Sequence, residues 1–292
     1  MTRQKQEARN GYIFVSPWFI GFVLFLLYPL VASLCYSFCD YSVLKTPVFT
    51  GLDNFIRLFH DDVFWTCVKN TAYFCAIFLP ASLVLSLGLA MLLNTKVWGM
   101  SIYRTIFYLP SLLPLVATAC VFLWVFDSKG VVNSFLQMIH IHGPDWLAST
   151  AWSKITIILL SLWGVGNTMI IYLAGLQEVP QSLYEAAEID GAKAWAKTKS
   201  VTLPMISPVI LFNLIIGIVG SIQIFTIPYV MFPQGTPANS TYFYTEYLYD
   251  NAFKFHEMGY ACAMGWILFV VTLLLTLVSL KISNKHVHYG GG

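Results

Sequence analysis

The sequence contains few charged residues for its length. Asp, Glu, Lys and Arg make up 10% of the 292 residues, against roughly 25% in an ordinary soluble domain. Hydrophobic residues make up 58%, and the mean hydropathy is +0.70. A chain of this composition has too little polar surface to fold in water. The composition therefore excludes a soluble domain and predicts a polytopic membrane protein.

Ionisable side chains are absent from every long apolar run. Six runs are long enough to cross a bilayer. They lie at about 12–34, 70–93, 105–126, 155–176, 205–232 and 259–280, and none contains Asp, Glu, Lys, Arg or His. Ion-coupled carriers and proton pumps need such groups at membrane depth to bind the coupling ion. The sequence thus disfavours a secondary transporter and predicts a single all-α transmembrane domain over 1–292.

Patterns for catalysis and metal binding are also missing. The chain has no G-x-x-x-x-G-K-[ST] phosphate loop, so any nucleotide hydrolysis must occur in another subunit. No Ser/His/Asp, Cys/His or paired-carboxylate arrangement lies within the apolar runs, which leaves an integral-membrane enzyme as the less favoured alternative. The six cysteines lack metal-ligand spacing, and His286 and His288 supply only two ligands. We predict no catalytic residue, metal or cofactor in this chain, and free thiols rather than a disulfide from Cys67 to Cys35 or Cys39.

The basic residues indicate how the chain is oriented. Six spans place both termini on one side, and if that side is inside, ten of the sixteen lysines and arginines are inside. Basic residues accumulate in cytoplasmic loops. The distribution therefore predicts cytoplasmic termini, and it places the segment 177–204 in the cytoplasm.

That segment, 177–204, is the longest polar interruption on the predicted cytoplasmic side. Ser182 and Glu185 have the spacing of a capping box, which predicts a helix over 183–189. Asp190-Gly191 is a turn dipeptide in which the glycine can adopt positive φ. A second helix is predicted over 192–201, ending before the Leu-Pro pair that follows. The segment is therefore predicted to form a helix–turn–helix hairpin.

The hairpin resembles the signature loop of binding-protein-dependent ABC transporter permeases, and within them the sugar-importer branch with the maltose and glycerol-phosphate permeases. The matching residues are Glu185, Ala186, Ala187, Asp190, Gly191, Ala192, Leu203 and Pro204. In that family the loop docks on a cytoplasmic ATPase and couples hydrolysis to transport. The resemblance implies the type I ABC importer fold, with six transmembrane helices and a cytoplasmic helix–turn–helix coupling loop.

The resemblance also implies partners and a substrate class. An importer of this kind contains a second homologous permease, two ATPase subunits that bind ATP and Mg²⁺, and an extracytoplasmic solute-binding protein. It lies in the cytoplasmic (inner) membrane of a bacterium or archaeon, and no nucleic acid takes part. The expected substrate is a sugar or oligosaccharide. Glycerol phosphate or another small solute is the alternative, although the spans hold no basic residue that would bind an anion.

Polar and small residues in the fourth and fifth spans are candidates for lining the substrate pathway. Amide and hydroxyl groups match the hydroxyl groups of a neutral sugar, and an aromatic ring can stack on a pyranose. The alternative is helix–helix packing, in which small residues allow close approach and amides bond across helices. The resemblance places both spans on the translocation pathway. The predicted pathway residues are Trp163, Gly164, Asn167, Asn213, Gly217, Gly220, Ser221, Gln223 and Tyr229.

Two prolines interrupt the third apolar run. Pro110 and Pro114 each remove a main-chain donor from a helix. Membrane helices tolerate proline where neighbouring groups or water satisfy the freed carbonyls. The pair predicts either a kink beside a cavity or a simple bend.

Overall fold

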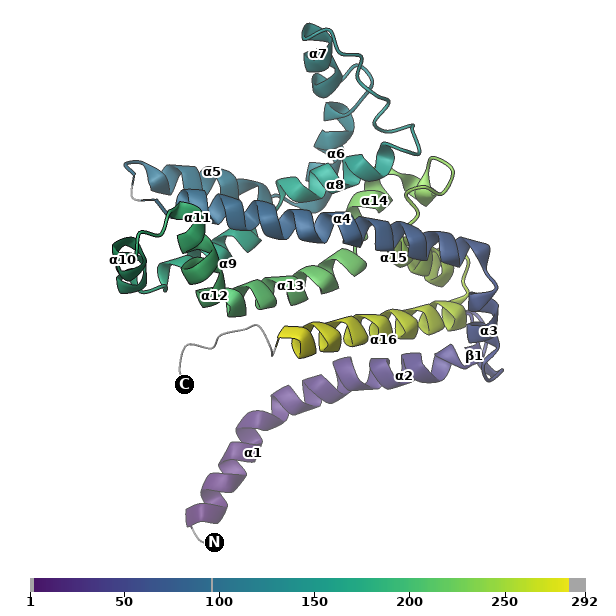
Figure 1. The fold of residues 1–292 in the computed structure, drawn as a ribbon. Helices are drawn as coiled ribbons and strands as arrows, with labels where there is room; N and C mark the ends of the chain where they lie inside the picture. Colours follow the sequence, from purple (N-terminus) through teal and green to yellow (C-terminus); the bar gives the residue numbers. More distant parts are fainter. Residues whose placement is uncertain (1–2, 96, 284–292) are drawn as a thin grey trace. The chain divides into compact units, whose positions relative to one another are not determined.

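The computed structural model describes residues 3–95 and 97–283, and helices dominate it (Figure 1). The β-structure of these residues is one antiparallel pair of two-residue strands, β1 (Cys39–Asp40) and β2 (Val48–Phe49). The prediction of an all-α polytopic membrane protein is confirmed. Contacts divide the chain into two compact units. Unit 1 comprises Met1–Asp61 and Leu248–Phe269, and unit 2 comprises Asp62–Tyr247 and Val270–Gly292.

The apolar helices account for the predicted spans. Four are long and apolar enough to cross a membrane, and two further pairs pass the same test but are bent, which gives up to six spans if each pair counts as one. The four are Asn10–Ser37, Asp62–Leu93, Ser207–Met231 and Met258–Ser283. The pairs are Met100–Leu112 with Leu115–Val125, bent by 97°, and Ser153–Trp163 with Gly166–Gln177, bent by 44°.

Unit 1 combines the N-terminal helices with a short segment from the C-terminal part of the sequence. Its elements are α1 (Arg3–Phe22), the π-helix η1 (Val23–Leu27), α2 (Tyr28–Ser37), the strand pair, α3 (Asp53–Phe59), the π-helix η4 (Asp250–Lys254) and the first part of α16 (Met258–Ser283). Asn54 donates from Nδ2 to the carbonyls of Ser37 (3.0 Å) and Cys39 (2.9 Å), which ties α3 to the end of α2.

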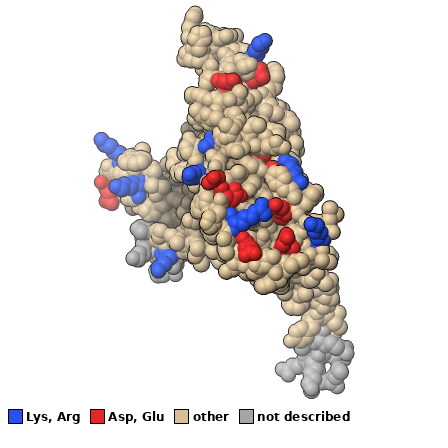
Figure 2. Space-filling model, turned by 90° about the vertical axis from the view of Figure 1, so that its right-hand side faces the viewer, with Lys and Arg blue, Asp and Glu red and all other residues tan. Residues whose placement is uncertain are grey.

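Charged side chains in unit 1 pair with one another. Arg57 binds Glu257 at 2.7 Å and lies 4.7 Å from the centre of the Tyr260 ring. Lys254 binds Asp250, which is almost fully buried, at 2.7 Å. Figure 2 shows Lys and Arg mixed with Asp and Glu on the face it displays, between broad uncharged areas.

Unit 2 is built on one long helix, α4 (Asp62–Leu93), against which α8, α9 and α13 pack (Figure 1). Its further elements, in chain order, are α5 (Met100–Leu112), α6 (Leu115–Val125), α7 (Val131–Met138), α8 (Ser153–Trp163), α9 (Gly166–Gln177), α10 (Gln181–Ile189), α11 (Ala194–Lys197), the π-helix η2 (Thr198–Thr202), α12 (Leu203–Met205), α13 (Ser207–Ile222), α14 (Thr226–Met231), the 3₁₀ turn η3 (Pro233–Gly235) and α15 (Tyr244–Tyr249), whose last two residues belong to unit 1.

Glycines allow the helices of unit 2 to approach closely. A Cβ atom at Gly175 of α9 would lie 2.8 Å from Val209 of α13, and one at Gly166 would lie 2.8 Å from the Phe107 carbonyl of α5. Neither position could carry a side chain without moving its neighbour. Small residues at such crossings are typical of membrane helix packing.

Several predictions about single residues have clear outcomes. All six cysteines are free thiols, so neither disulfide alternative forms. The basic residues Lys96 and Lys285 lie outside the described residues, as do His286 and His288. The predicted fifth span began at residue 205, whereas α13 begins at Ser207 because Ile206 has left the helical conformation (φ −91°, ψ 7°).

The loop between α14 and α15 is held by α4. Three residues without the freedom of glycine adopt positive φ there, namely Gln234, Ala238 and Asn239. Asn70 of α4 is 4% exposed, and its Nδ2 donates to the carbonyls of Asn239 (2.8 Å) and Tyr242 (3.0 Å). One buried amide thus donates to two loop carbonyls and ties the loop to α4.

We expect Asn70→Asp to destabilise the protein markedly. The aspartate keeps the shape but replaces a donor by an acceptor that faces two carbonyl oxygens. The loss of two buried hydrogen bonds, together with an acceptor placed against two carbonyl oxygens, costs roughly 2–4 kcal/mol. The thermal unfolding midpoint in detergent should fall by several degrees. The control is Asn94→Asp, at a half-exposed amide for which the described residues provide no side-chain hydrogen bond. Equal midpoints for the two variants would contradict the role given to Asn70.

Candidate functional site

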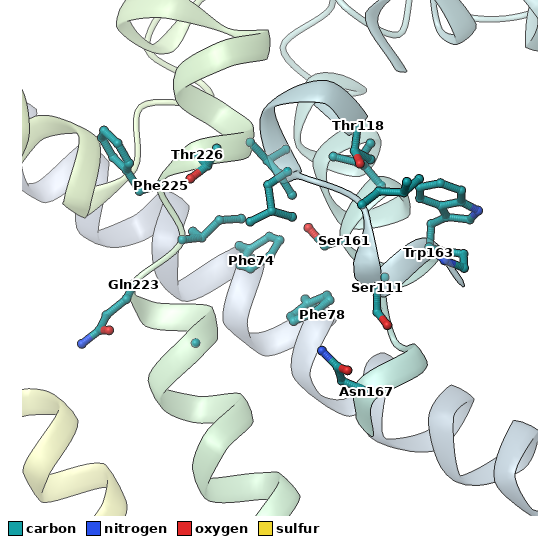
Figure 3. A pocket seen from close by; sticks show the side chains of 18 residues that line it. Phe74, Phe78, Ser111, Thr118, Ser161, Trp163, Asn167, Gln223, Phe225 and Thr226 are labelled. Atoms are coloured by element: carbon teal, nitrogen blue, oxygen red, sulfur yellow. The ribbon is translucent and has the colours of Figure 1, made fainter. Parts of the chain in front are cut away.

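A cavity of about 450 Å³ lies within unit 2. Its walls come from α4 and from the places where three other spans are interrupted. α5 ends and α6 begins at Leu113-Pro114, α8 gives way to α9 at Gly164-Val165, and α13 gives way to α14 at residues 223–225. Figure 3 shows these segments around the cavity.

The interruptions have local causes that can be read from the chain. Pro114 has no N–H, and Leu113 before it is extended (φ −75°, ψ 140°), as the residue before a proline prefers to be. Gly164 (φ −88°, ψ 15°) ends α8. Phe225 is non-helical (φ −138°, ψ −59°), and the Thr245 hydroxyl donates to the Ile224 carbonyl beside it. Pro110 and Pro114 therefore mark a kink beside a cavity, which decides between the two alternatives.

Aromatic side chains form much of the cavity wall. Phe74 and Phe78 of α4 stack with their ring centres 4.9 Å apart and an angle of 13° between planes. Phe225 lines the cavity and stacks on Tyr229, with ring centres 5.0 Å apart. No described lining residue is Asp, Glu, Lys, Arg or His. The wall is therefore aromatic in large part and uncharged.

The polar groups of the wall are hydroxyls and two primary amides. The hydroxyls belong to Ser111, Thr118, Ser161 and Thr226, and the amides to Asn167 and Gln223. Both amide side chains are exposed, and neither makes a side-chain hydrogen bond with the part of the chain that the structure describes. In Figure 3 the Asn167 amide points toward Phe78, whereas Gln223 extends away from the other labelled side chains. Neither amide joins one helix to another.

Five of the nine predicted pathway residues line the cavity. These five are Trp163, Gly164, Asn167, Gly220 and Gln223. The Trp163 ring also packs on Phe122, with ring centres 5.1 Å apart. Tyr229 does not line the cavity and reaches it only through its stack on Phe225.

The other three predicted pathway residues lie away from the cavity. Asn213 is 4% exposed, and among the described residues its Nδ2 has no hydrogen-bond partner. A Cβ atom at Gly217 would lie 2.5 Å from Cδ1 of Leu79, so Gly217 packs against α4. Ser221 is 2% exposed and donates to the Ile218 carbonyl within its own helix. The stripe of these three residues thus faces neighbouring helices.

Sequence reasoning missed the contributions of α4, α5 and α6. Phe74, Phe78, Ser111 and Thr118 line the cavity from these helices. The two phenylalanines are four residues apart and share a helix face, but aromatic residues at that spacing are common on any membrane helix. The proline interruption was the usable signal for Ser111 and Thr118, since both flank it.

The helix–turn–helix over the segment 177–204 is present, and its turn is the predicted one. Gly191 has φ +77°, as predicted. Its N–H donates to Glu188 O (2.9 Å), and the Ala192 N–H donates to Ala187 O (2.9 Å). This pair of bonds is a Schellman motif, in which a residue in the left-handed conformation ends the helix. Glycine adopts that conformation without steric cost.

Two side-chain contacts hold the halves of the hairpin together. Lys197 Nζ lies 2.6 Å from Glu188 Oε1. The hydroxyls of Tyr184 and Thr202 lie 3.0 Å apart. The hairpin is therefore fixed by its turn, by an ion pair and by a hydrogen bond.

The predicted capping box is wrong. α10 begins at Gln181, its N-cap is Pro180 (φ −59°, ψ 129°), and no side chain caps it. Ser182 is already inside the helix, so it cannot adopt the non-helical conformation that a capping residue needs. The Glu185 carboxylate is exposed and makes no hydrogen bond or ion pair with the described residues. Glu185 consequently has no capping role.

The prediction that the second helix spans 192–201 and ends before Leu203-Pro204 is also wrong. α11 begins at Ala194, and helical structure continues through the π-helix η2 and α12 to Met205. Pro204 has no N–H for an i−4 bond and its ring crowds that carbonyl. The wider π turn, in which Leu203 N–H bonds Thr198 O, relieves this conflict. The hairpin therefore joins α13 with only a break at Ile206.

The outer surface of the hairpin is apolar in places. Ile189 is 87% exposed and Trp195 is 76% exposed. Ala186 and Asp190 are exposed as well, whereas Ala187, Ala192, Leu203 and Pro204 are half-buried. Large exposed apolar side chains beside charged ones are typical of a protein–protein contact.

The whole chain is similar to known transporter permeases. A permease called probable ABC transporter permease protein YesP, from Bacillus subtilis, is 38% identical over 98% of this chain and 94% of its own length. The lactose transport system permease protein LacF of Rhizobium radiobacter is 36% identical over 92% of each chain. The arabinooligosaccharides transport system permease protein AraP of B. subtilis is 32% identical over 94% of this chain and 88% of its own.

Solved structures agree with these relatives. A chain of a bacterial alginate ABC transporter, in complex with an alginate pentasaccharide-bound periplasmic protein, matches with a TM-score of 0.84 and 26% identity over 98% of both chains. The model of the family described as binding-protein-dependent transport system inner membrane component matches residues 82–288, which include the cavity's broken spans and the hairpin. The chain therefore belongs to the binding-protein-dependent transport system inner membrane components, the permeases of ABC importers.

Proposed function

We propose that this permease carries a neutral sugar or oligosaccharide across the membrane through the cavity of unit 2. The observation that carries the proposal is the chemistry of the wall, which combines stacked aromatic rings, hydroxyls and two free amides with no ionisable group. Sugars present apolar ring faces and neutral hydroxyls, which this wall complements. Relatives described as lactose and arabinooligosaccharide permeases support the same substrate class.

The uncharged wall argues against an anionic solute. Moving a charged group into an apolar site without a partner costs far more than moving a hydroxyl. Glycerol phosphate would need a cationic or strongly donating site, and the described lining offers no Lys, Arg or His. The solved neighbour is described as importing an acidic polysaccharide. The shared fold thus leaves the charge of the substrate open, and the proposal of a neutral one rests on the lining.

We infer that the energy comes from separate subunits. The chain has no phosphate loop, so ATP and Mg²⁺ would be bound by two ATPase subunits in the cytoplasm. The exposed apolar residues of the hairpin are suited to dock there, and the matching loop residues support this role. A second permease and a solute-binding protein complete the proposed assembly. Both termini would lie in the cytoplasm, as the distribution of basic residues favours.

The coupling would run along one continuous stretch of chain. Figure 1 shows the hairpin at one end of α13 and α14 at the other. Closure of the ATPase dimer would move the hairpin, and helical structure from α11 through α13 would carry the movement to the cavity. Alternating access follows if this movement opens the cavity to one side and closes it to the other.

The substrate class is tested by uptake into cells that carry the complete transporter. Lactose, arabinotriose and maltotriose are supplied beside a uronic-acid trisaccharide and glycerol phosphate. We expect uptake of at least one neutral sugar and of neither anion. Uptake of the anions alone would refute the proposed substrate class.

The two amides are expected to contribute to recognition without supporting the fold. A hydrogen bond to a neutral partner contributes roughly 0.5–1.5 kcal/mol, so Asn167→Ala or Gln223→Ala should weaken sugar binding by about two- to twelvefold. Assembly should be unchanged, because neither side chain bonds the described part of the chain. The control is Asn133→Ala in α7, whose Oδ1 accepts a hydrogen bond from Trp146 Nε1 (2.9 Å) and which does not line the cavity. Unchanged affinity in both amide variants would remove them from recognition.

The turn of the hairpin is expected to decide ATPase docking. Valine is strongly disfavoured at the positive φ of Gly191, whereas asparagine tolerates it. Steric crowding by neighbouring residues does not explain this difference, since a Cβ atom at Gly191 would meet nothing within 4 Å. Gly191→Val should therefore lose co-purifying ATPase and sugar-stimulated hydrolysis, while Gly191→Asn retains most of both. If the valine variant couples normally, the hairpin is not the coupling element.

A further inference from the structure

The end of α13 leaves main-chain carbonyl groups free, and one of them belongs to Gly220, which lines the cavity. The last hydrogen bond of this helix joins Gln223 N–H to Val219 O (3.2 Å). In the part of the chain that the structure describes, the carbonyls of Gly220, Ser221 and Ile222 accept no hydrogen bond. Carbonyls of an α-helix point toward its C-terminal end, here the interruption that lines the cavity.

Free carbonyls at membrane depth need an explanation. The hydrocarbon region offers no donor, so irregular backbone is tolerated there only where it is buried in protein or lines a cavity. The Ile224 carbonyl has its own donor in the Thr245 hydroxyl. The preceding three carbonyls have no such partner, and of these three residues it is Gly220 that lines the cavity, from which a donor can reach its carbonyl.

Gly220 exposes the main chain at this place. It lines the cavity, and a Cβ atom there would meet nothing within 4 Å. Gly217, one turn earlier, differs because its Cβ atom would collide with Leu79. Packing therefore accounts for Gly217 but not for Gly220. A glycine without a packing role or positive φ is suited to close approach of a ligand to the backbone.

We infer that Gly220 is a specificity-determining residue, at which a sugar lies directly on the main chain and a hydroxyl donates to the free Gly220 carbonyl near the end of α13. The inference rests on the proposed function, since it assumes a hydroxylated solute in the cavity. It differs from recognition by Asn167 and Gln223, because an amide side chain can donate or accept whereas a carbonyl only accepts.

The test compares three substitutions at Gly220 with one elsewhere. Gly220→Ala, Gly220→Ser and Gly220→Val fill the open space stepwise. The matched control is Gly88→Val in α4, another exposed helical glycine whose added Cβ would meet nothing within 4 Å and which does not line the cavity. Binding is measured by calorimetry on the assembled permease–ATPase complex without its solute-binding protein, so that the affinity reports the permease.

The probes are the best-transported of lactose, arabinotriose and maltotriose, with its monodeoxy and deoxyfluoro analogues. In the wild type, at least one deoxy analogue should bind about three- to tenfold more weakly. The matching fluoro analogue should be equally weak, because fluorine cannot donate to a carbonyl. In Gly220→Val this discrimination should vanish, in Gly220→Ala it should shrink, and in Gly88→Val it should persist.

The outcomes separate this inference from the proposed function. If no neutral sugar is taken up by the wild type, the proposed function fails and the inference with it. If sugars are taken up but the ratio between parent and deoxy analogue is the same in all Gly220 variants, only the inference is overturned. Full affinity for the fluoro analogue also overturns it, since the protein group would then be a donor. Should the valine variant not assemble, the alanine and serine variants give the same ratio test.

Discussion

Main-chain polar groups must be satisfied inside a membrane, and unit 2 is arranged around this constraint. A continuous helix satisfies its own groups, whereas each interruption frees several of them. Among the described residues, three spans have an interruption that lies at the cavity. Helical continuity is therefore lost at the wall of the cavity, where we propose that the sugar lies. The rest of the unit, from α4 to the pinned α14–α15 loop, keeps these interruptions together.

The sequence predicted the class of fold and the hairpin turn because these depend on local chemistry. Long apolar runs without charge can only be spans, and Asp190-Gly191 required a left-handed turn that the structure contains. Residue type also identified Asn167 and Gln223 as unusual in such runs. These features needed no knowledge of neighbouring helices.

The predictions that were wrong concerned features that depend on neighbouring helices or on the residue at which a helix begins or ends. The stripe of Asn213, Gly217 and Ser221 identified a helix face correctly, but periodicity cannot say whether that face meets another helix or a cavity. Gly220 and Gln223, off the stripe, line the cavity instead. The capping box failed because α10 begins two residues earlier than the motif suggested. The predicted end at Leu203-Pro204 failed because a π turn accommodates the proline.

The π turn η2 has a consequence for how this chain can change in evolution. Each residue of an α-helix advances the side-chain direction by about 100°. Adding or deleting one residue between the hairpin and Ile222 would turn the cavity-lining face of α13 toward a different neighbour. Insertions and deletions should therefore be excluded from this stretch. Length variation among such permeases is then expected in the loops, such as the one between α7 and α8, where no helical phase has to be kept.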